Sequence, residues 1–430
     1  MLSSHLLFPR LKTAHQGPLS LLETHVLSNS SKIEAWFQKR WLETPALITT
    51  SVDLRHAGFK ISPVDTNLFP AGFNNLHADS LDLCVQALQL VISERMPECR
   101  RIVVIPENHT RNAFYLQSLW VLQQCLVKAG FLVHLGSLDP ELTEAVFLET
   151  AEGHRLCIEP LVRKDHKIWI GHHEPCLLIL NHDLSAGIPD ILKNLNQPIL
   201  PGLDLGWGSR LKSSHFLFFN QVIDEFSELI DVNSWLINPI FCAVSGVDFM
   251  QQTGLEPLAH LIDKVIAHVR VQYQTHGITE RPFVAVKADN GTYGMSVMMV
   301  HEGKQMLQLN RKQRTKMATR KGGQKVSNIL IQEGVYSIET MLDQAVAEPV
   351  IYLIGSKVVG GFYRIHEARG SDENLNTPGM YFRPMAFESV PLEAYDSPRH
   401  QDISNRFYVY GVIARLAALA AAREHAAIVF

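Results

Sequence analysis

Apolar positions recur along the first half of the chain in two different patterns. They lie at helical spacing in "SLDLCVQALQLVISERM" (80–96) and "AFYLQSLWVLQQCLVKAG" (113–130). Short continuous apolar runs stand beside these helices and end in polar residues: "RRIVVI" (100–105), "FLVHLG" (131–136) and "CLLIL" (176–180). Strands that alternate with helices predict a mostly parallel sheet in an α/β domain.

The flanking regions have other patterns. Residues 1–44 predict helix, and a short strand (46–52) opens a long polar loop. Beyond about residue 240 we expect a helix (256–277), a strand pair (283–289 and 295–301), a strand (328–335), a helix (337–347) and two further strands within 349–366. The fold class is therefore α/β, with α+β in the C-terminal half. The expected units are an N-terminal helical segment (1–44), an α/β substrate-binding domain (45–240) and a third domain (241–430).

Composition narrows the class of protein. A chain of 430 residues with 46% apolar residues can bury a large core. A net charge of −4 gives no reason to expect nucleic acid or a membrane as partner. Six scattered cysteines without a CxxC pair fit a reducing cytosol, and the first residues lack a signal-peptide pattern. Arg415 and Arg423 interrupt the late apolar stretch, which predicts a buried or amphipathic helix. We expect a cytoplasmic protein and leave a homo-oligomer open.

The stretch "FVAVKADNGTYGM" (283–295) begins as a buried strand and ends on Lys287 before a glycine loop. Such a loop lets backbone N–H groups approach an anion closely, and the lysine supplies charge. The alternative is an Asn-Gly hairpin turn, which is compatible with a phosphate-binding flap. The residues expected to bind phosphate are Lys287, Asn290, Gly291, Thr292, Tyr293 and Gly294.

Two later segments extend this interpretation. The basic segment 311–325 holds seven Lys and Arg residues around Gly322-Gly323, and we expect a mobile loop that closes over a triphosphate. A solvated face is the alternative; a nucleic-acid patch is disfavoured because the segment has no aromatic residue. The strand "ILIQEGV" (329–335) ends on Gln332, Glu333 and Val335, whose backbone groups are candidates to contact an adenine edge, although it is also simply a strand.

The run "FYRIHEARGSDENLNTPG" (362–379) combines arginines with oxygen ligands, as Mg²⁺-bound phosphates require. The alternative is a polar surface loop. The candidate catalytic arginines are Arg364 and Arg369. The candidate metal ligands are Glu367, Asp372, Glu373, Asn374 and Asn376.

The polar loop after the strand at 46–52 is the candidate substrate site, because ligands of open α/β sheets bind beyond the carboxyl ends of strands. Arg55 and Lys60 are expected to bind substrate carboxylates, and Asp53 or Asp65 an ammonium group. Loops after later strands add polar residues such as Asn181, Lys212 and His215, although Asp and Asn often only cap turns. The expected substrate-binding residues are Asp53, Arg55, Lys60, Asn67, Asn74, Asn75 and Arg210. The histidines around "GHHEPC" (171–176) lack zinc-ligand spacing.

The order of these parts resembles the ATP-grasp superfamily, and the tail resembles glutathione synthetase. The resemblance, which covers residues 255–430, implies that Lys287 binds the α- and β-phosphates, residues 332–335 the adenine, Arg364 the transferring phosphoryl group and Asn374 or Asn376 Mg²⁺. The acidic "E-x-N" strand of glutathione synthetase is not found after the final helix. Metal ligands are therefore expected elsewhere, at Glu367, Asp372 and Glu373.

Five motifs together resemble a proteobacterial glutamate–cysteine ligase family of ATP-grasp type: "TTSVDLRHAGFKISPVDTNLFPAGFNNL", "LNHDLSAGIP", "KADNGTYGMSVM", "QEGV" and "ENLNTPGMYFRP". The resemblance spans about residues 45–430. It implies ATP-dependent joining of glutamate and cysteine, the first step of glutathione synthesis, with ATP and Mg²⁺. The alternatives are another ATP-grasp carboxylate–amine ligase, a non-catalytic nucleotide-binding protein, or a nucleic-acid-binding protein.

Overall fold

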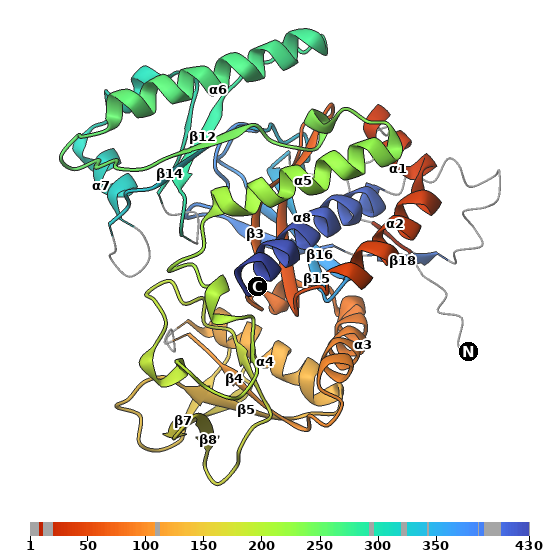
Figure 1. The fold of residues 1–430 in the computed structure, drawn as a ribbon, viewed down its shortest axis with the longest axis vertical. Coiled ribbons are helices and arrows are strands. Elements are labelled where there is room, and N and C mark those ends of the chain that lie inside the picture. The colour runs from red at the N-terminus through yellow and green to blue at the C-terminus, as the bar shows by residue number, and fades with distance from the viewer. Residues whose placement is uncertain are drawn as a thin grey trace.

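The computed structural model describes residues 8–11, 20–107, 112–291, 296–319, 325–341, 344–385, 387–390 and 406–429. It is a mixed α/β protein with three main sheets, which lie one after another along the molecule with the five-stranded sheet in the middle (Figure 1). A separate antiparallel pair joins β1 (Phe8–Leu11) to β18 (Phe387–Val390). The α/β class and the mostly parallel sheet of the N-terminal half are confirmed.

The seven-stranded sheet has the order β10-β9-β4-β5-β7-β6, with β8 paired to β7. Its strands are β4 (Arg101–Ile105), β5 (Leu132–Ser137), β6 (Val146–Glu149), β7 (Arg155–Lys164), β8 (Lys167–Ile170), β9 (Leu177–Leu180) and β10 (Ile199–Leu200). Pairings from β10 to β7 are parallel, and β6 and β8 pair with β7 in antiparallel fashion. The predicted helices are present as α3 (Ala78–Arg95) and α4 (Ala113–Lys128).

The four-stranded sheet is antiparallel in the order β11-β14-β12-β13. Its strands are β11 (Phe241–Val244), β12 (Val284–Ala288), β13 (Val297–Val300) and β14 (Ile329–Glu333). One face packs on the long helix α6 (Leu255–Thr275), with which it shares a hydrophobic core. The start of the basic segment forms the short helix α7 (Arg311–Ala318) instead of a loop, and residues 320–324 lie outside the described part.

The five-stranded sheet is antiparallel and combines strands from both ends of the chain. Its order is β17 (Tyr381–Pro384), β16 (Lys357–His366), β15 (Val346–Ile354), β2 (Thr49–His56) and β3 (Ile61–Asn67). The helices packed beside it are α1 (Leu21–Ser28), α2 (Ser30–Glu43), α5 (Lys212–Ile230) and α8 (Arg406–Val429). Because β2 and β3 pair with C-terminal strands, this sheet crosses the expected boundary at residue 240, and the proposed division into domains stays a prediction.

The loops contain short 3-10 helices: η1 (Phe73–Asn75), η2 (Asp190–Leu192), η3 (Leu203–Leu205), η4 (Ser234–Leu236) and η5 (Gly303–Met306). The late apolar stretch is α8, whose side chains from Phe407 to Ala422 are buried all round, so it is a core helix. Across the described ranges, none of the helices has the length and hydropathy of a membrane span.

Three predicted elements are wrong. Residues 8–11 of the expected helical segment form β1. The polar stretch after residue 52 is not a long loop but continues β2 and forms β3. The described residues of the segment 337–347, which are 337–341 and 344–347, do not form the expected helix: the N–H of Ile338 donates to the carbonyl of His56, and that of Ala347 donates to the carbonyl of Glu339. These tertiary and local loop hydrogen bonds take the place of helical ones within this segment.

Candidate active site

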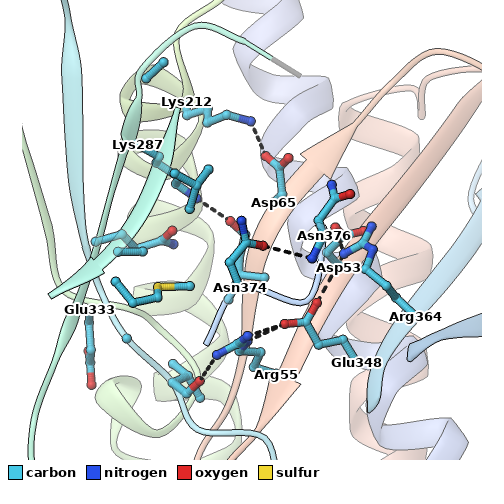
Figure 2. A pocket seen from close by; sticks show the side chains of 18 of the residues that line it. Asp53, Arg55, Asp65, Lys212, Lys287, Glu333, Glu348, Arg364, Asn374 and Asn376 are labelled. Atoms are coloured by element: carbon cyan, nitrogen blue, oxygen red, sulfur yellow. Dashed lines mark hydrogen bonds and ion pairs between the residues drawn. The ribbon is translucent and has the colours of Figure 1, made fainter. Parts of the chain in front are cut away.

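A cleft of about 730 Å³, partly open to solvent, lies between the four-stranded and five-stranded sheets (Figure 2). Strands β2 and β3 and the start of α5 contribute from the N-terminal half, and β12 to β16 from the C-terminal half. The polar and charged residues that line it are Asp53, Arg55, Asp65, Lys212, Lys287, Gln332, Glu333, Glu348, Arg364, Asn374 and Asn376. The two halves of the chain therefore share one cleft.

Lys287 faces the cleft because of the alternation along β12. Val284 and Val286 point into the core beneath α6, so Ala285 and Lys287 point to the other face. The Nζ of Lys287 donates to the carbonyl oxygen of Val64 at 2.6 Å. Burial lowers the pKa of Lys287 to about 8, although the charge of Asp65 opposes this change. The lysine predicted at this strand end is thus a buried cation in the cleft.

One part of the cleft is mainly apolar. Ala285, Val297 and Met299 line it on the same sheet face as Gln332, since β12 pairs with both β13 and β14. Gln332 is 1% exposed, and its Nε2 has no hydrogen-bond partner among the described residues. Val335 follows at the end of β14. Apolar walls with an unused donor suit a flat heteroaromatic base.

Charged side chains line the opposite wall. The carboxylate of Glu348 (β15) accepts hydrogen bonds from Arg55 Nε at 2.6 Å and from Arg364 Nη1 at 3.2 Å. Arg364 Nη1 also donates to Asp53 Oδ2 at 2.7 Å. On the same face of β15, Val350 and Tyr352 belong to the core around α3. This face of the sheet is therefore apolar under the helices and charged at the cleft.

The charges on this wall perturb one another. Burial raises the pKa of Asp53, and the carboxylates of Asp65 and Glu348 raise it further against the opposing charge of Arg364. Burial lowers the pKa of Arg364, but Asp53 and Glu348 raise it above its usual range. Burial is thus the main reason why Asp53 holds its proton more tightly than a carboxyl group in water.

Asp65 and Lys212 form an ion pair where α5 meets the cleft. Burial raises the pKa of Asp65, but Lys212 and Lys287 together lower it to about 2. Asp289, just after β12, accepts hydrogen bonds from Ser213 N at 2.8 Å and Ser213 Oγ at 2.6 Å. These bonds cap the N-terminus of α5 and fix it beside the glycine loop.

Arg55 lines the cleft, but its donors are engaged inside the protein. It donates to the carbonyl oxygens of Val335 at 3.0 Å and Ser371 at 3.3 Å, and also to that of Glu373. Nε and Nη2 contact the carboxylate of Glu348. All three nitrogens of the guanidinium thus have protein partners. Arg55 ties the segment after β14 to the 371–373 loop and leaves little capacity for a substrate carboxylate.

The other two expected substrate cations, Lys60 and Arg210, do not line the cleft. Lys60 is 1% exposed, pairs with Glu333 at 2.9 Å and lies 4.3 Å from the ring centroid of Trp235. Burial lowers the pKa of Lys60 to about 8, against the opposing charge of Glu333. Arg210 pairs with Glu424 at 2.8 Å. Both are internal ion pairs.

Further predicted residues also lie outside the lining. Asn67 ends β3, and Asn74 and Asn75 belong to η1. Of the expected metal ligands, Asn374 and Asn376 line the cleft, whereas Glu367, Asp372 and Glu373 do not. The carboxylate of Glu373 instead accepts from Arg369 Nη1 and Gly370 N, each at 2.8 Å.

The glycine loop is described in part. Gly291 lines the cleft with a φ of 152°, within the range that favours glycine, and Asn290 precedes it. Thr292, Tyr293 and Gly294 lie outside the described residues.

Sequence patterns do not single out Glu348. It stands in the apolar strand "VAEPVIYLI" (346–354), and its only signal is that a lone carboxylate in a buried strand needs a cation. That cation, Arg364, becomes its direct neighbour only through the register of β15 and β16.

Within the part of the chain that the structure describes, the histidines do not gather around a zinc-type site. In that part, His182 lies with two carboxylates, Glu107 and Asp183, with ligand atoms within 4.8 Å of one another. Glu107 accepts the N–H of Asp183 at 2.9 Å, and Asp183 accepts that of Ser185 at 3.0 Å. Both carboxylates therefore already accept backbone hydrogen bonds from the loop at residues 183–185.

Comparisons with known proteins agree with this geometry. The model of the family described as GshA, glutamate-cysteine ligase, matches residues 23–425. A crystal structure from Methylobacillus flagellatus KT, described as a gamma-glutamylcysteine synthetase, is 49% identical with a TM-score of 0.86 and covers 98% of this chain and 100% of the other. The comparison with curated proteins finds no match.

Two solved structures match at low similarity. They are a glutathione synthetase-like effector from Globodera pallida (10% identity, TM-score 0.36, 84% of this chain and 79% of the other) and a D-alanyl-alanine synthetase A from Vibrio cholerae (11%, 0.36, 74% and 81%). At this TM-score neither establishes a shared fold.

The family match over nearly the whole chain identifies an ATP-dependent ligase, and the cleft that holds buried cations against carboxylates is its candidate active site. The family can then be named. The chain belongs to the glutamate–cysteine ligase family, whose members carry out the first step of glutathione synthesis.

Proposed function

We propose that the cleft is the centre at which ATP activates the γ-carboxylate of glutamate for attack by the amine of cysteine. The observation that carries the proposal is the convergence of Lys287 and Arg364 with carboxylates from the N-terminal strands in one cleft. A non-catalytic nucleotide-binding protein would not require this combination of groups. The fold that accompanies the proposal is of ATP-grasp type, and the expected location is the cytoplasm.

ATP is proposed to lie between the two sheets. Its base would occupy the apolar part of the cleft beside Met299 and Val335, with Gln332 Nε2 as a hydrogen-bond donor. The phosphates would extend toward Lys287 and the N–H groups near Gly291. Arg364 on the opposite wall would then face the transferring phosphoryl group.

The chemistry proceeds in two steps. An oxygen of the γ-carboxylate attacks the γ-phosphorus of ATP, the bond to the β,γ-bridging oxygen breaks, and ADP leaves. The cysteine amine then attacks the acyl carbon of the mixed anhydride, inorganic phosphate leaves with the C–O bond electrons, and the amine loses a proton. Lys287 and Arg364 offset the charge that develops on the transferring group. Positioning and charge stabilisation supply most of the catalysis.

The donor set fits Mg²⁺. Asp53 and Glu348 offer carboxylate oxygens, and Asn374 and Asn376 line the same cleft with amide groups. Burial raises the pKa of Asp53, with smaller contributions from the carboxylates of Asp65 and Glu348, and a bound divalent cation would favour its ionised form. When bound, Mg²⁺ would supply charge neutralisation to the phosphates. This assignment replaces Glu367, Asp372 and Glu373, which lie outside the lining.

The test measures ADP release in the presence of Mg²⁺. We expect release that depends on glutamate and cysteine together and is slower with other amino-acid pairs. Lys287→Met should raise the KM for ATP at least about tenfold, the loss of roughly 1.4 kcal/mol of phosphate binding. ADP release with a different carboxylate–amine pair would favour another ligase of the same class. ATP binding without ADP release would contradict catalysis.

A further inference from the structure

The cleft lacks an obvious cation for the part of the acyl donor that does not react. Arg55, Lys60 and Arg210 are the cations expected from the sequence to bind substrate, yet all three have internal partners. The nitrogens of Arg55 contact Glu348 and three carbonyl oxygens, Lys60 is sealed against Glu333, and Arg210 is paired with Glu424. Binding a substrate carboxylate would break an existing buried contact at each of them.

Lys212 differs from these three cations. It lies at the first position of α5, lines the cleft and is 6% exposed. Its ammonium group pairs with Asp65 and lies 4.0 Å from the ring centroid of Trp207. An ammonium group carries three N–H donors, and the described contacts give only one of them to a carboxylate. Lys212 can therefore accept a second anion without giving up its partner.

The position of Lys212 is fixed by the backbone around it. Its own N–H donates to the carbonyl oxygen of Asp289 at 2.7 Å, and the Asp289 carboxylate holds Ser213. Trp207 covers the ammonium group from the loop that leads out of the seven-stranded sheet. The lysine thus sits between the glycine loop and the N-terminal α/β sheet.

Lys212 and Lys287 both line the cleft on the side that faces Asp65 (Figure 2). The charge of Lys212 contributes to the lowered pKa of Lys287, after the larger effect of burial, so the two ammonium groups repel each other. The carboxylate of Asp65 interacts with both of them, and those of Asp53 and Asp289 also interact with Lys287. Because Asp65 interacts with both ammonium groups, its one negative charge does not offset both of them, and an additional anion beside Lys212 would be stabilised.

We propose that Lys212 binds the non-reacting α-carboxylate of the acyl donor and thereby selects an amino dicarboxylic acid. The proposal rests on the proposed function, in which Lys287 and Arg364 are occupied by phosphates. Of the four cations that line the described part of the cleft, Arg55 is then engaged internally and Lys212 remains.

The experiment compares two acyl donors. Glutamate carries the α-carboxylate, whereas 4-aminobutyrate keeps the reacting carboxylate and the amine but lacks it. Lys212→Met should lower kcat/KM for glutamate at least about tenfold and leave that for 4-aminobutyrate within about twofold. The dissociation constant of glutamate, measured by calorimetry, should rise by the same factor, while that of ATP stays within about twofold. Lys212→Arg should restore part of the glutamate affinity.

Lys193→Met is the matched control, because Lys193 also pairs with an aspartate, Asp190, but is half exposed and is not part of the cleft lining. Melting curves identify variants that fail to fold, and Lys212→Arg then decides the question through the glutamate and ATP dissociation constants. Equal losses for both donors, or a weaker ATP affinity with unchanged glutamate affinity, would overturn the proposal. Wild-type enzyme without glutamate-dependent ADP release would instead reject the proposed function.

Discussion

At the scale of single residues, the cleft shifts the pKa values of ionisable groups away from those that they have in water. Lys287 is the clearest case, because burial lowers its pKa to about 8 while its role requires the protonated form. The free protein therefore loses this charge as the pH rises through about 8. A bound phosphate would favour the ammonium form and raise its pKa again.

ATP binding should follow this titration. We expect the dissociation constant of an ATP analogue to be nearly constant from about pH 6.5 to 7.5, where Lys287 is protonated, and to rise about tenfold per pH unit well above 8. Calorimetry between pH 6.5 and 9.5 measures the change. In Lys287→Met the rise should be absent, which separates it from the titration of Lys60. If the dissociation constant of the ATP analogue for the wild type does not change with pH, the charge of Lys287 does not contribute to phosphate binding.

The roles of Glu348 and Arg55 cannot be predicted from the local sequence, because they depend on contacts with distant segments. Lys287 is predictable because local sequence alone places a lysine between a buried strand and a glycine loop. The role of Arg55 depends on Val335, Ser371 and Glu373, about 300 positions away. The polar residues around Arg55 therefore look like surface residues in the sequence. They form a buried hydrogen-bond network only because the register of distant strands brings them together.

At the scale of elements, the sequence predicts a helix or strand correctly where the element depends mainly on the spacing of its own apolar residues. The helices α3, α4 and α6 follow their apolar spacing closely. The helix predicted for 337–347 fails because its backbone groups bond to β2 and to nearby loops instead. The polar stretch 53–67 forms two strands because Val52, Leu54 and Ile61 reach the core on one face.

The end of β14 is secured by a buried ion pair rather than by substrate contacts. Glu333 accepts hydrogen bonds from Lys60 at 2.9 Å, from Ile240 N at 2.9 Å and from Trp235 Nε1 at 3.1 Å. Lys60→Met would leave this carboxylate buried without its cation. We expect the free energy of unfolding to fall by about 3–5 kcal/mol.

Urea unfolding measures this loss, and Lys60→Met combined with Glu333→Gln should recover most of it. Lys304→Met is the control, since Lys304 pairs with Glu302 at the surface and should cost at most about 1 kcal/mol. For the folded fraction, the KM for glutamate should remain within about twofold. A large rise in the KM for glutamate with unchanged stability would instead show that Lys60 binds substrate.

At the scale of the whole molecule, the cleft depends on both ends of the chain. The mostly parallel sheet and the antiparallel C-terminal sheet are predictable from periodicity, but the insertion of β2 and β3 beside β15 is not. The pairing between residues 49–53 and 350–354 cannot be predicted from the local pattern of either strand. The five-stranded sheet therefore combines strands from both sides of the boundary expected near residue 240.

This topology predicts that the C-terminal part does not fold as a unit by itself. A fragment of residues 241–430 would lose β2 and β3, expose the edge of β15, and lack Asp53, Arg55 and Asp65 from the cleft. We expect it to show no cooperative thermal transition by circular dichroism and no ATP binding by calorimetry. Co-expression with residues 1–240 as a separate chain should restore both, because the strands can then pair as they do in the intact protein. An isolated fragment that melts cooperatively and binds ATP with the affinity of the full chain would instead make residue 240 a true domain boundary, and the contribution of the N-terminal strands to nucleotide binding would have to be abandoned.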